Sequence, residues 1–405
     1  MKKWAVIFFL AGFWGCVQDN DFEDLAPIEK KTEFNLQIPD DFSWSAVMQD
    51  VLLVNVTSAG KETLVLDRTA MELYNENGEL LDAVIINDGT ACFNVRIPAS
   101  TKKLILKATA SNTVLEFSAL KRSLRLEVPV SFKSVNEKKD TDGDGLINQF
   151  DHAPGNPQIA LSLNENFINK TSSYFIFEDL WPSKGDFDFN DFIVKTSFSW
   201  KRGIGNYLTE ISGIVEAQWS DSNYGLGFEL FEAKGAYLIY MDDVIMSMEG
   251  AQKAEVMNNG LIVVNETDGY GKITRKFTVK IKDKSLTNFV FVPFLFRKEN
   301  RQHQIRPFGT PPTQLQQMDM FRSEDDASPL SWQWVTGEKF KNPLSGDDAF
   351  YRTAEGHPWG VQFVAEYFVP SPEKQSIAES YPQFKTWAES GGKENKDWYY
   401  YPATE

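Results

Sequence analysis

The amino-acid sequence predicts an all-β protein. We expect an N-terminal antiparallel β-sandwich and a larger C-terminal β-rich domain of the sandwich or jelly-roll type, with only minor helix. Two observations lead to this prediction. Short apolar runs that suit strands recur along the chain, with turn residues between them. The chain has 405 residues, of which 42% are hydrophobic, so it is long enough to bury the cores of two or three domains.

The first residues have the features of a secretory signal. Met1-Lys2-Lys3 is positively charged, and the apolar run that ends at Gly15 is too short to cross a bilayer. Cys16 follows at the place where a lipoprotein signal carries its lipidated cysteine, so we predict a lipoprotein signal peptide over 1–16 and an acidic tether over 17–31. The acidic residues after Cys16 resemble the surface-export tag of Bacteroidetes lipoproteins. That resemblance implies a lipid-anchored protein at the outer-membrane or cell surface. The alternative is an ordinary signal peptide with a chance cysteine.

Charge and cysteine content exclude some classes of function. The formal net charge is −16 and no basic footprint is present, which argues against a nucleic-acid partner. If Cys16 is acylated, Cys92 has no partner and the chain can form no internal disulfide. We interpret Cys92 as a half-buried structural thiol in a strand. A secreted protein without disulfides needs another stabilising cross-link, and a bound metal ion is a candidate.

Residues 32–132 show the pattern of an immunoglobulin-like β-sandwich. Asn75 to Gly78 is predicted to be a hairpin tip, and no helical period of comparable length appears in this region. Turn residues separate the predicted strands, as expected for an antiparallel sandwich. These strands are Phe34–Ile38, Val51–Val56, Met71–Tyr74, Ala91–Ile97, Leu104–Ala108 and Leu124–Val130.

The linker 133–158 contains the pattern of a calcium loop. Oxygen-bearing side chains fall at positions 1, 3, 5, 9 and 12, with glycine at position 6, as in the EF-hand loop. The predicted ligands are Asp140, Asp142, Asp144, Asn148 and Asp151, together with the backbone carbonyl of Leu146. Prolines rather than helices follow the loop, so it resembles a single thrombospondin type 3 repeat, which implies that Ca²⁺ stiffens a linker between domains. The alternative is a flexible Asp/Gly linker.

A second acidic stretch runs from residue 177 to residue 194. Five carboxylates are crowded among aromatic residues, and Lys184 is the sole cation in the stretch. In a strand, Asp186 and Asp188 would share one face while Phe187 and Phe189 would occupy the other. Dense oxygen ligands with few counter-charges suit Ca²⁺. We predict a second calcium site formed by Glu178, Asp179, Asp186, Asp188 and Asp191, with Asn190 holding the turn. The alternative is a solvated acidic loop.

This stretch also carries a family resemblance. Glu178-Asp179, Trp181-Pro182 and the run from Gly185 to Asp191 resemble the signature of the LruC-domain family. Those are secreted lipoproteins and surface proteins of Bacteroidetes, Leptospira and other bacteria. The resemblance implies a β-rich extracellular module over 159–405 with no established catalytic activity. It continues through Pro307–Leu315, Tyr351–Thr353, Gly356–Trp359, Tyr381–Gly392 and Asp397–Tyr399.

The C-terminal region is predicted to be mainly strands. One short helix is expected over Ile377–Ser390, docking Phe384 and Trp387 and ending at Gly391. The predicted strands are Ser173–Glu178, Phe192–Trp200, Ile211–Trp219, Tyr224–Phe231, Ala236–Met241, Leu261–Asn265, Lys272–Ile281 and Phe289–Arg297.

No motif in the sequence indicates an enzyme. The histidines form no His-Glu-x-x-His pair, and no Gly-x-Ser-x-Gly elbow is present. We interpret His357, between Gly356 and Pro358, as a structural hydrogen-bonding residue. The sequence favours a calcium-stabilised surface lipoprotein that binds glycans or host or bacterial surface partners without catalysis. The alternatives are a purely structural protein of the cell envelope or matrix and, more distantly, a carbohydrate-active hydrolase.

Overall fold

The computed structural model describes residues 34–58, 68–111, 113–121, 123–128, 139–163, 172–219, 223–234, 237–241, 244–249, 254–257, 260–263, 271–330, 339–341 and 348–403. Strands dominate these residues and helices are few and short, which confirms the predicted all-β class. No described helix has the length and apolar character needed to cross a membrane. Cys16 and the predicted tether lie outside the described residues.

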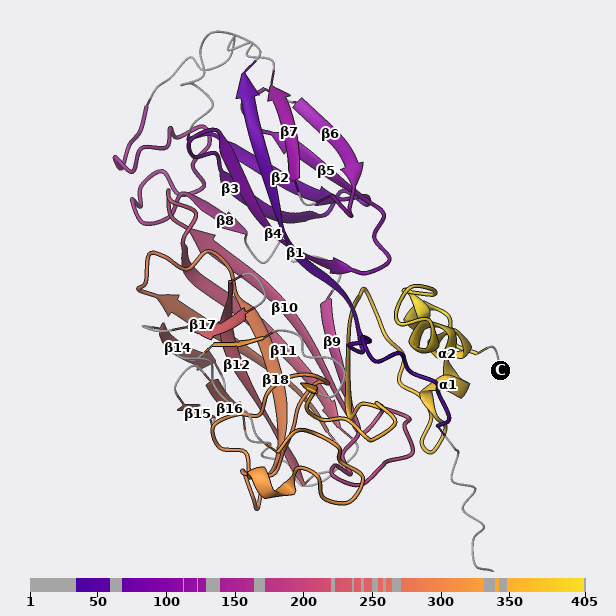
Figure 1. Cartoon of the computed structure of the whole chain (residues 1–405). Coiled ribbons are helices and arrows are strands. Elements are labelled where there is room, and N and C mark those ends of the chain that lie inside the picture. The colour runs from indigo at the N-terminus through magenta and orange to yellow at the C-terminus, as the bar shows by residue number, and fades with distance from the viewer. Residues whose placement is uncertain are drawn as a thin grey trace, which may run out of the picture. The chain divides into compact units, whose positions relative to one another are not determined.

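The N-terminal sandwich consists of two sheets (Figure 1). In one sheet the central strand β1 pairs with β4 in antiparallel and with β7 in parallel orientation. The other sheet has the order β3-β2-β5-β6 and is antiparallel throughout. The predicted hairpin tip at Asn75–Gly78 is confirmed, because it joins β2 to β3 and Gly78 has a φ of 79°. The strands are β1 (Ser45–Ser58), β2 (Ala70–Asn75), β3 (Leu80–Ile85), β4 (Thr90–Pro98), β5 (Lys103–Ala108), β6 (Thr113–Ser118) and β7 (Ser123–Val128).

Alternating side chains of the sandwich strands fill its core. On β4, Phe93, Val95 and Ile97 are buried, whereas Cys92 on the opposite face is exposed. The expectation of a half-buried thiol is therefore wrong, because the strand alternation turns Cys92 away from the core. The predicted strand at Phe34–Ile38 is also wrong, since this segment has no strand partner among the described residues.

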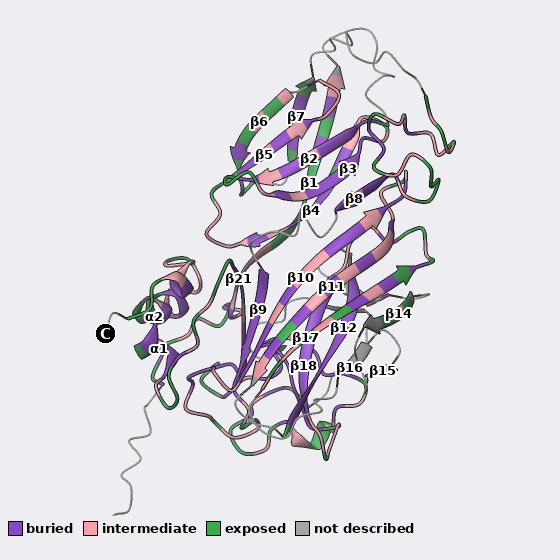
Figure 2. Ribbon diagram, turned by 180° about the vertical axis from the view of Figure 1, so that it is seen from behind, coloured by how far each residue is buried: buried purple, intermediate pink, exposed green. Residues whose placement is uncertain are grey.

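The remaining strands form two further sheets around the largest core. The first has the order β14-β17-β11-β10-β9-β21, with β8 pairing to β10, and the second is built around β12, β16 and β18. Figure 2 shows buried residues along most of β9, β10 and β18. The strands are β8 (Leu161–Leu163), β9 (Ser172–Phe177), β10 (Phe192–Arg202), β11 (Leu208–Trp219), β12 (Tyr224–Lys234), β13 (Tyr237–Tyr240), β14 (Val244–Glu249), β15 (Ala254–Met257), β16 (Gly260–Val263), β17 (Gly271–Ile281), β18 (Val290–Arg297), β19 (Gln304–Ile305), β20 (Lys339–Lys341) and β21 (Gly360–Ala365).

Strand β1 also joins the first of these sheets to its own, so that both belong to one continuous ten-stranded sheet. Its first residues Ser45 and Ala46 pair in parallel with Gln362 and Phe363 of β21. A buried ion pair adds a second connection, because an Nη2 of Arg202 on β10 lies 3.3 Å from Oδ1 of Asp82 on β3. Separating the two strands would leave each of these buried charges without its partner, which is strongly destabilising, so the pair favours the observed contact.

Short helices near the C-terminus pack on a cluster of aromatic side chains (Figure 1). The predicted helix is present as two pieces, α1 (Ile377–Ser380) and α2 (Pro382–Glu389). The single-turn helix η5 (Trp398–Tyr400) packs beside α2, and η3 (Met318–Met320) lies in another part of the chain. Phe384 and Trp387 are fully buried, and Gly391 after α2 has a φ of 65°, as predicted. We call the buried residues around α2 the C-terminal aromatic cluster; among its members are Phe34, Phe42, Trp44, Phe187, Phe189, Phe363, Phe384, Trp387, Trp398 and Tyr399.

Candidate metal sites

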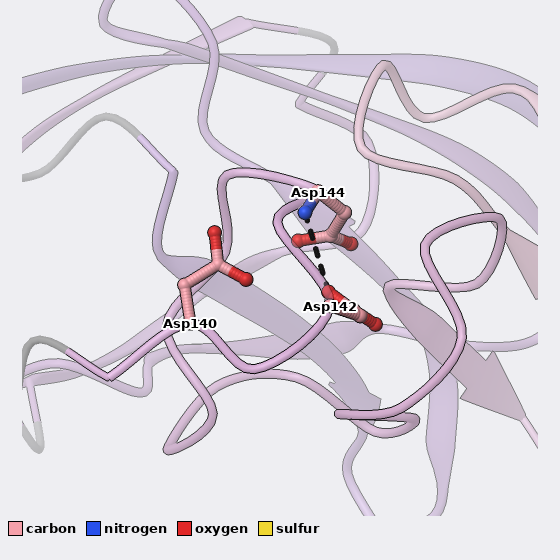
Figure 3. A group of neighbouring side chains, drawn as sticks. All are labelled: Asp140, Asp142 and Asp144. Atoms are coloured by element: carbon pink, nitrogen blue, oxygen red, sulfur yellow. Dashed lines mark hydrogen bonds between the residues drawn. The ribbon is translucent and has the colours of Figure 1, made fainter.

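The linker loop brings three of its predicted ligands together. Carboxylate oxygens of Asp140, Asp142 and Asp144 all lie within 4.8 Å of one another (Figure 3). The loop folds back on itself because Oδ1 and Oδ2 of Asp140 accept hydrogen bonds from the backbone N–H groups of Gly143 and Gly145, at 2.7 and 2.9 Å. Such local bonds are the usual way in which aspartates shape a tight turn.

Three carboxylate oxygens in this loop accept no hydrogen bond from the described residues. Oδ2 of Asp142, of Asp144 and of Asp151 is buried and lacks a hydrogen-bond partner within the described part of the chain. A buried polar group without a partner is costly, and a buried charge costs more. Burial and the neighbouring carboxylates of Asp142 and Asp140 raise the pKa of Asp144. Burial, followed by Asp144 and Asp142, likewise raises the pKa of Asp151. The loop therefore concentrates negative charge that its own hydrogen bonds do not satisfy.

The other loop positions have structural contacts. The side chain of Leu146 is fully buried in the largest core, which pins the middle of the loop. Asn148 uses its side-chain oxygen and nitrogen on Thr141, at 2.9 and 2.7 Å. A Cβ built at Gly145 would lie 2.7 Å from Nη1 of Arg68, so this guanidinium rests against the loop. Sequence reasoning missed Arg68, which comes from a distant turn before β2.

The second acidic stretch connects β9 to β10 as a loop. The expectation of a strand over 186–190 is wrong, because Phe187 and Phe189 adopt left-handed backbone conformations with φ of 57° and 54°. Such a conformation is uncommon for aromatic residues and is held by tertiary packing. Both rings are buried in the C-terminal aromatic cluster, and their burial draws the intervening carboxylate of Asp188 inward, where it is 1% exposed.

Two groups of carboxylates form in this loop. Oxygens of Glu178, Asp188 and Asp191 lie within 4.8 Å of one another, and so do those of Asp186, Asp188 and Glu373. Asp188 thus joins the two groups. Asp179 belongs to neither group, although it contacts the site through its backbone N–H, which donates to Oδ2 of Asp191 at 3.1 Å.

Backbone N–H groups orient these carboxylates. Phe189 N–H donates to Oε1 of Glu178 at 2.7 Å. Asn190 bonds both oxygens of Asp188, through its N–H at 3.0 Å and its Nδ2 at 2.8 Å. Nδ2 of Asn190 also donates to the carbonyl of Ser371, at 3.1 Å, so this residue holds the turn as predicted. A Cβ built at Gly185 would lie 1.8 Å from Oε2 of Glu178, which explains why glycine stands beside this carboxylate.

Burial and neighbouring like charges raise the pKa values of three carboxylates in this cluster. Burial, and then Asp191 and Asp188, raise the pKa of Glu178 well above its ordinary range. Burial and the carboxylates of Asp179 and Asp188 raise the pKa of Asp191 to about 8. Burial, with Asp186 and Glu373, raises the pKa of Asp188 to about 6. Like charges and low dielectric both disfavour ionisation, so these carboxylates are poised either to hold protons or to bind a cation.

Lys184 does not neutralise the cluster. Its Nζ lies 3.0 Å from Oε2 of Glu355 and 4.0 Å from Oδ1 of Asp325.

Glu373 in the second group of carboxylates was missed by sequence reasoning. It lies in the segment directly before α1 and reaches the loop only through tertiary folding, and its one sequence signal is an acidic residue in a Pro-Ser-Pro-Glu run.

The histidines have structural surroundings. Nε2 of His357 contacts the carbonyl of Leu36 at 3.3 Å, and its ring packs edge-on against Phe34 and Phe187. Burial lowers the pKa of His357. His303 is also buried, and its Nε2 contacts the carbonyl of Trp181 at 2.9 Å.

The fold and these loops define a β-rich protein with two candidate cation sites built from carboxylates. A family model described as "Domain of unknown function (DUF4842)" matches residues 199–399. No curated protein matches this chain. Among solved structures, one described as a "Putative lipoprotein from Bacteroides ovatus" matches with 14% sequence identity and a TM-score of 0.38, covering 87% of this chain and 97% of that chain. This likeness is too distant to bear on function.

Proposed function

We propose that this chain is a calcium-stabilised surface lipoprotein that acts as a non-catalytic binding or adhesion module. The single observation that carries the calcium part is the set of three buried, unpartnered carboxylate oxygens on Asp142, Asp144 and Asp151. They come from three different positions of one loop that matches the EF-hand spacing, and a cation would supply the partner that such oxygens lack. Oxygens of Asp140, Asp142 and Asp144 already lie within 4.8 Å of one another, whereas Asp151 stands outside that group.

Electrostatic repulsion supports a cation at both sites. Two carboxylates about 4 Å apart repel by roughly 4 kcal/mol at an effective dielectric near 20. Glu178 and Asp188 are each 1% exposed, so water provides little screening at the second site. Carboxylate and carbonyl oxygens in flexible loops suit Ca²⁺ better than Mg²⁺, which demands near-ideal octahedral geometry. Extracellular calcium modules bind with a Kd of roughly 10⁻⁴–10⁻³ M, which agrees with a protein exposed outside the cell.

The anchor is the second part of the proposal. Cys16 follows a positively charged start and an apolar run, and the acidic residues behind it suit a tether. The folded part would then be held at the outer-membrane surface by lipid on Cys16, and the LruC resemblance agrees with that location. A glycan or a surface protein is the partner that this setting favours.

Calcium titration of the mature protein by calorimetry tests the linker site. We expect Asp144→Asn to remove one binding event, because it removes a carboxylate whose Oδ2 has no hydrogen-bond partner among the described residues. Asp40→Asn is the matched control, since Asp40 is an exposed aspartate outside both clusters. The linker site is contradicted if the wild-type protein shows no heat of calcium binding. It is also contradicted if Asp144→Asn and the wild type bind calcium with the same heat.

A further inference from the structure

A cleft separates the face of the N-terminal sandwich from the sheet that contains β9, β10 and β21. Its volume is about 540 Å³, within the range of roughly 300–1,000 Å³ that is usual for small-molecule sites. Its walls combine aromatic rings with polar side chains, the arrangement that binds a small ligand and fixes its orientation. The residues that line the cleft include Gln49, Arg96, Ser173, Phe198, Phe289 and Gln362.

Arg96 is the distinctive residue of this cleft. It lies on the outward face of β4 and is half-buried. Its Nε donates to Oγ of Ser173 at 3.2 Å, and its Nη1 donates to Oε1 of Gln49 at 3.1 Å. Both partners are neutral, and within the described residues no carboxylate oxygen lies within 4.0 Å of its guanidinium. Nη2 has no hydrogen-bond partner among those residues either.

Arg202, the other cation that lines the cleft, is paired with a carboxylate. Arg202 is paired with Asp82 at 3.3 Å, and its Nη1 donates to the carbonyls of Asn206 and Thr287. Burial lowers the pKa of Arg96 to about 10, so it stays protonated at neutral pH while no anion of the described chain compensates its charge. A planar guanidinium with free donors is suited to bind a carboxylate through two parallel hydrogen bonds.

The rest of the wall offers complementary contacts. Phe198 and Phe289 pack edge to face with ring centroids 5.1 Å apart, and both remain partly exposed. Aromatic rings of this kind cover the apolar face of a sugar ring. Gln362 on β21 is partly exposed, and its side-chain amide makes no hydrogen bond with a described residue, so it can serve sugar hydroxyls.

We propose that this cleft binds a carboxylate-bearing sugar of the uronic-acid type, with the guanidinium of Arg96 on the carboxylate, Gln362 on hydroxyls and Phe198 against the ring. The inference rests on the proposed binding role and gives it a site and a ligand class. It depends on neither cation site.

Calorimetric titration of the mature protein with glucuronate and galacturonate disaccharides tests this proposal, with the uncharged glucose and galactose disaccharides as neutral counterparts. We expect binding of the acidic sugars alone, and a loss of at least tenfold in affinity for Arg96→Met. Arg125→Met is the matched control, because Arg125 lies exposed on β7 of the same sandwich and outside the cleft. Gln362→Leu, which keeps Arg96 in place, should also weaken sugar binding and serves if Arg96→Met does not fold.

The proposal would be overturned by equal binding of neutral sugars, by no binding of any acidic sugar, or by unchanged affinity in the folded Arg96→Met and Gln362→Leu variants. The same titration with inorganic sulfate is a further test. If sulfate binds as tightly as the acidic sugars, the cleft is a simple anion site and the proposal is wrong. Calcium titration of the same sample is a separate readout, so failure of the sugar site and failure of the calcium sites are distinguished.

Discussion

The backbone N–H of Lys374 donates a hydrogen bond to Oδ2 of Asp188 at 2.9 Å, although 186 residues separate them in sequence. Three residues further on, the N–H of Ile377 donates to the carbonyl of Phe187 at 2.7 Å. The acidic loop is thereby joined to the start of α1. A cation on Asp188 would consequently stabilise the C-terminal helices as well as the loop.

Thermal unfolding with and without calcium tests this coupling. A ligand that binds only the folded state stabilises it by about 2.7 kcal/mol at 100 times its Kd. We expect the wild-type midpoint to rise in millimolar Ca²⁺ and Asp188→Asn to lose at least half of that rise. Asp319→Asn, at an exposed position in η3, should respond as the wild type does. A wild-type midpoint that does not move with calcium would mean that the cluster is only an acidic loop.

The pH dependence of stability should reveal the same cluster. The pKa values of Asp188 and Asp191 are raised to about 6 and about 8, whereas an unfolded aspartate titrates near 3.9. Between the unfolded pKa and each raised pKa, the folded protein therefore binds more protons than the unfolded chain. Its stability falls as the pH rises through about 6 for Asp188 and then through about 8 for Asp191. Each pKa unit corresponds to roughly 1.4 kcal/mol.

Denaturant unfolding in chelator, from pH 5 to pH 8.5, measures this fall. Calcium replaces the protons at high pH, so the stabilisation by Ca²⁺ should grow over the same interval. A calcium effect that is constant with pH would argue that these carboxylates do not ligate the ion.

Gly185 provides a test of the geometry around Glu178. Gly185→Ala places a Cβ 1.8 Å from Oε2 of Glu178, so the carboxylate must move and weaken its hydrogen bond with Phe189 N–H. Leaving a buried donor such as this N–H unsatisfied costs about 1–3 kcal/mol. We expect lower stability and weaker calcium binding in calorimetry. At Gly155 an added Cβ meets nothing within 4 Å, so Gly155→Ala should leave both quantities unchanged.

The two cysteines provide a matched test of the anchor. Metabolic labelling with an alkyne fatty acid should mark the wild-type protein and Cys92→Ser, whereas Cys16→Ser should stay unlabelled. Cys92 is exposed in the folded protein, which makes it a fair control for nonspecific acylation. Mass spectrometry of the mature N-terminus completes the test, and a retained Met1 would end the lipoprotein proposal.

Local sequence patterns predicted much of the fold. The Asn75–Gly78 hairpin and the docking of Phe384 and Trp387 follow from turn residues and apolar spacing, which depend on neighbours in the chain. Strand β21 was not predicted from its Gly-Val-Gln-Phe-Val-Ala run, and the structure shows it as a strand paired with β9.

The candidate sites were predictable only in part. The linker loop carries its predicted ligands within twelve consecutive positions, so spacing alone indicated that Asp140, Asp142 and Asp144 would lie together. In the second cluster, Glu373 arrives from a distant segment and Phe187 takes a left-handed conformation because the aromatic cluster holds its ring. Neither effect is encoded within a short window of sequence.

The packing of Phe34 has a mechanical consequence. Its ring stacks on Phe187 with centroids 4.3 Å apart, and Trp44 farther along reaches the carbonyl of Gly356 through its Nε1 at 2.8 Å. A pulling force applied at Phe34 would load these contacts before it reached the sandwich strands. We therefore expect the first rupture in a single-molecule pulling experiment to occur at the aromatic cluster, and to need higher force when calcium holds the neighbouring acidic loop.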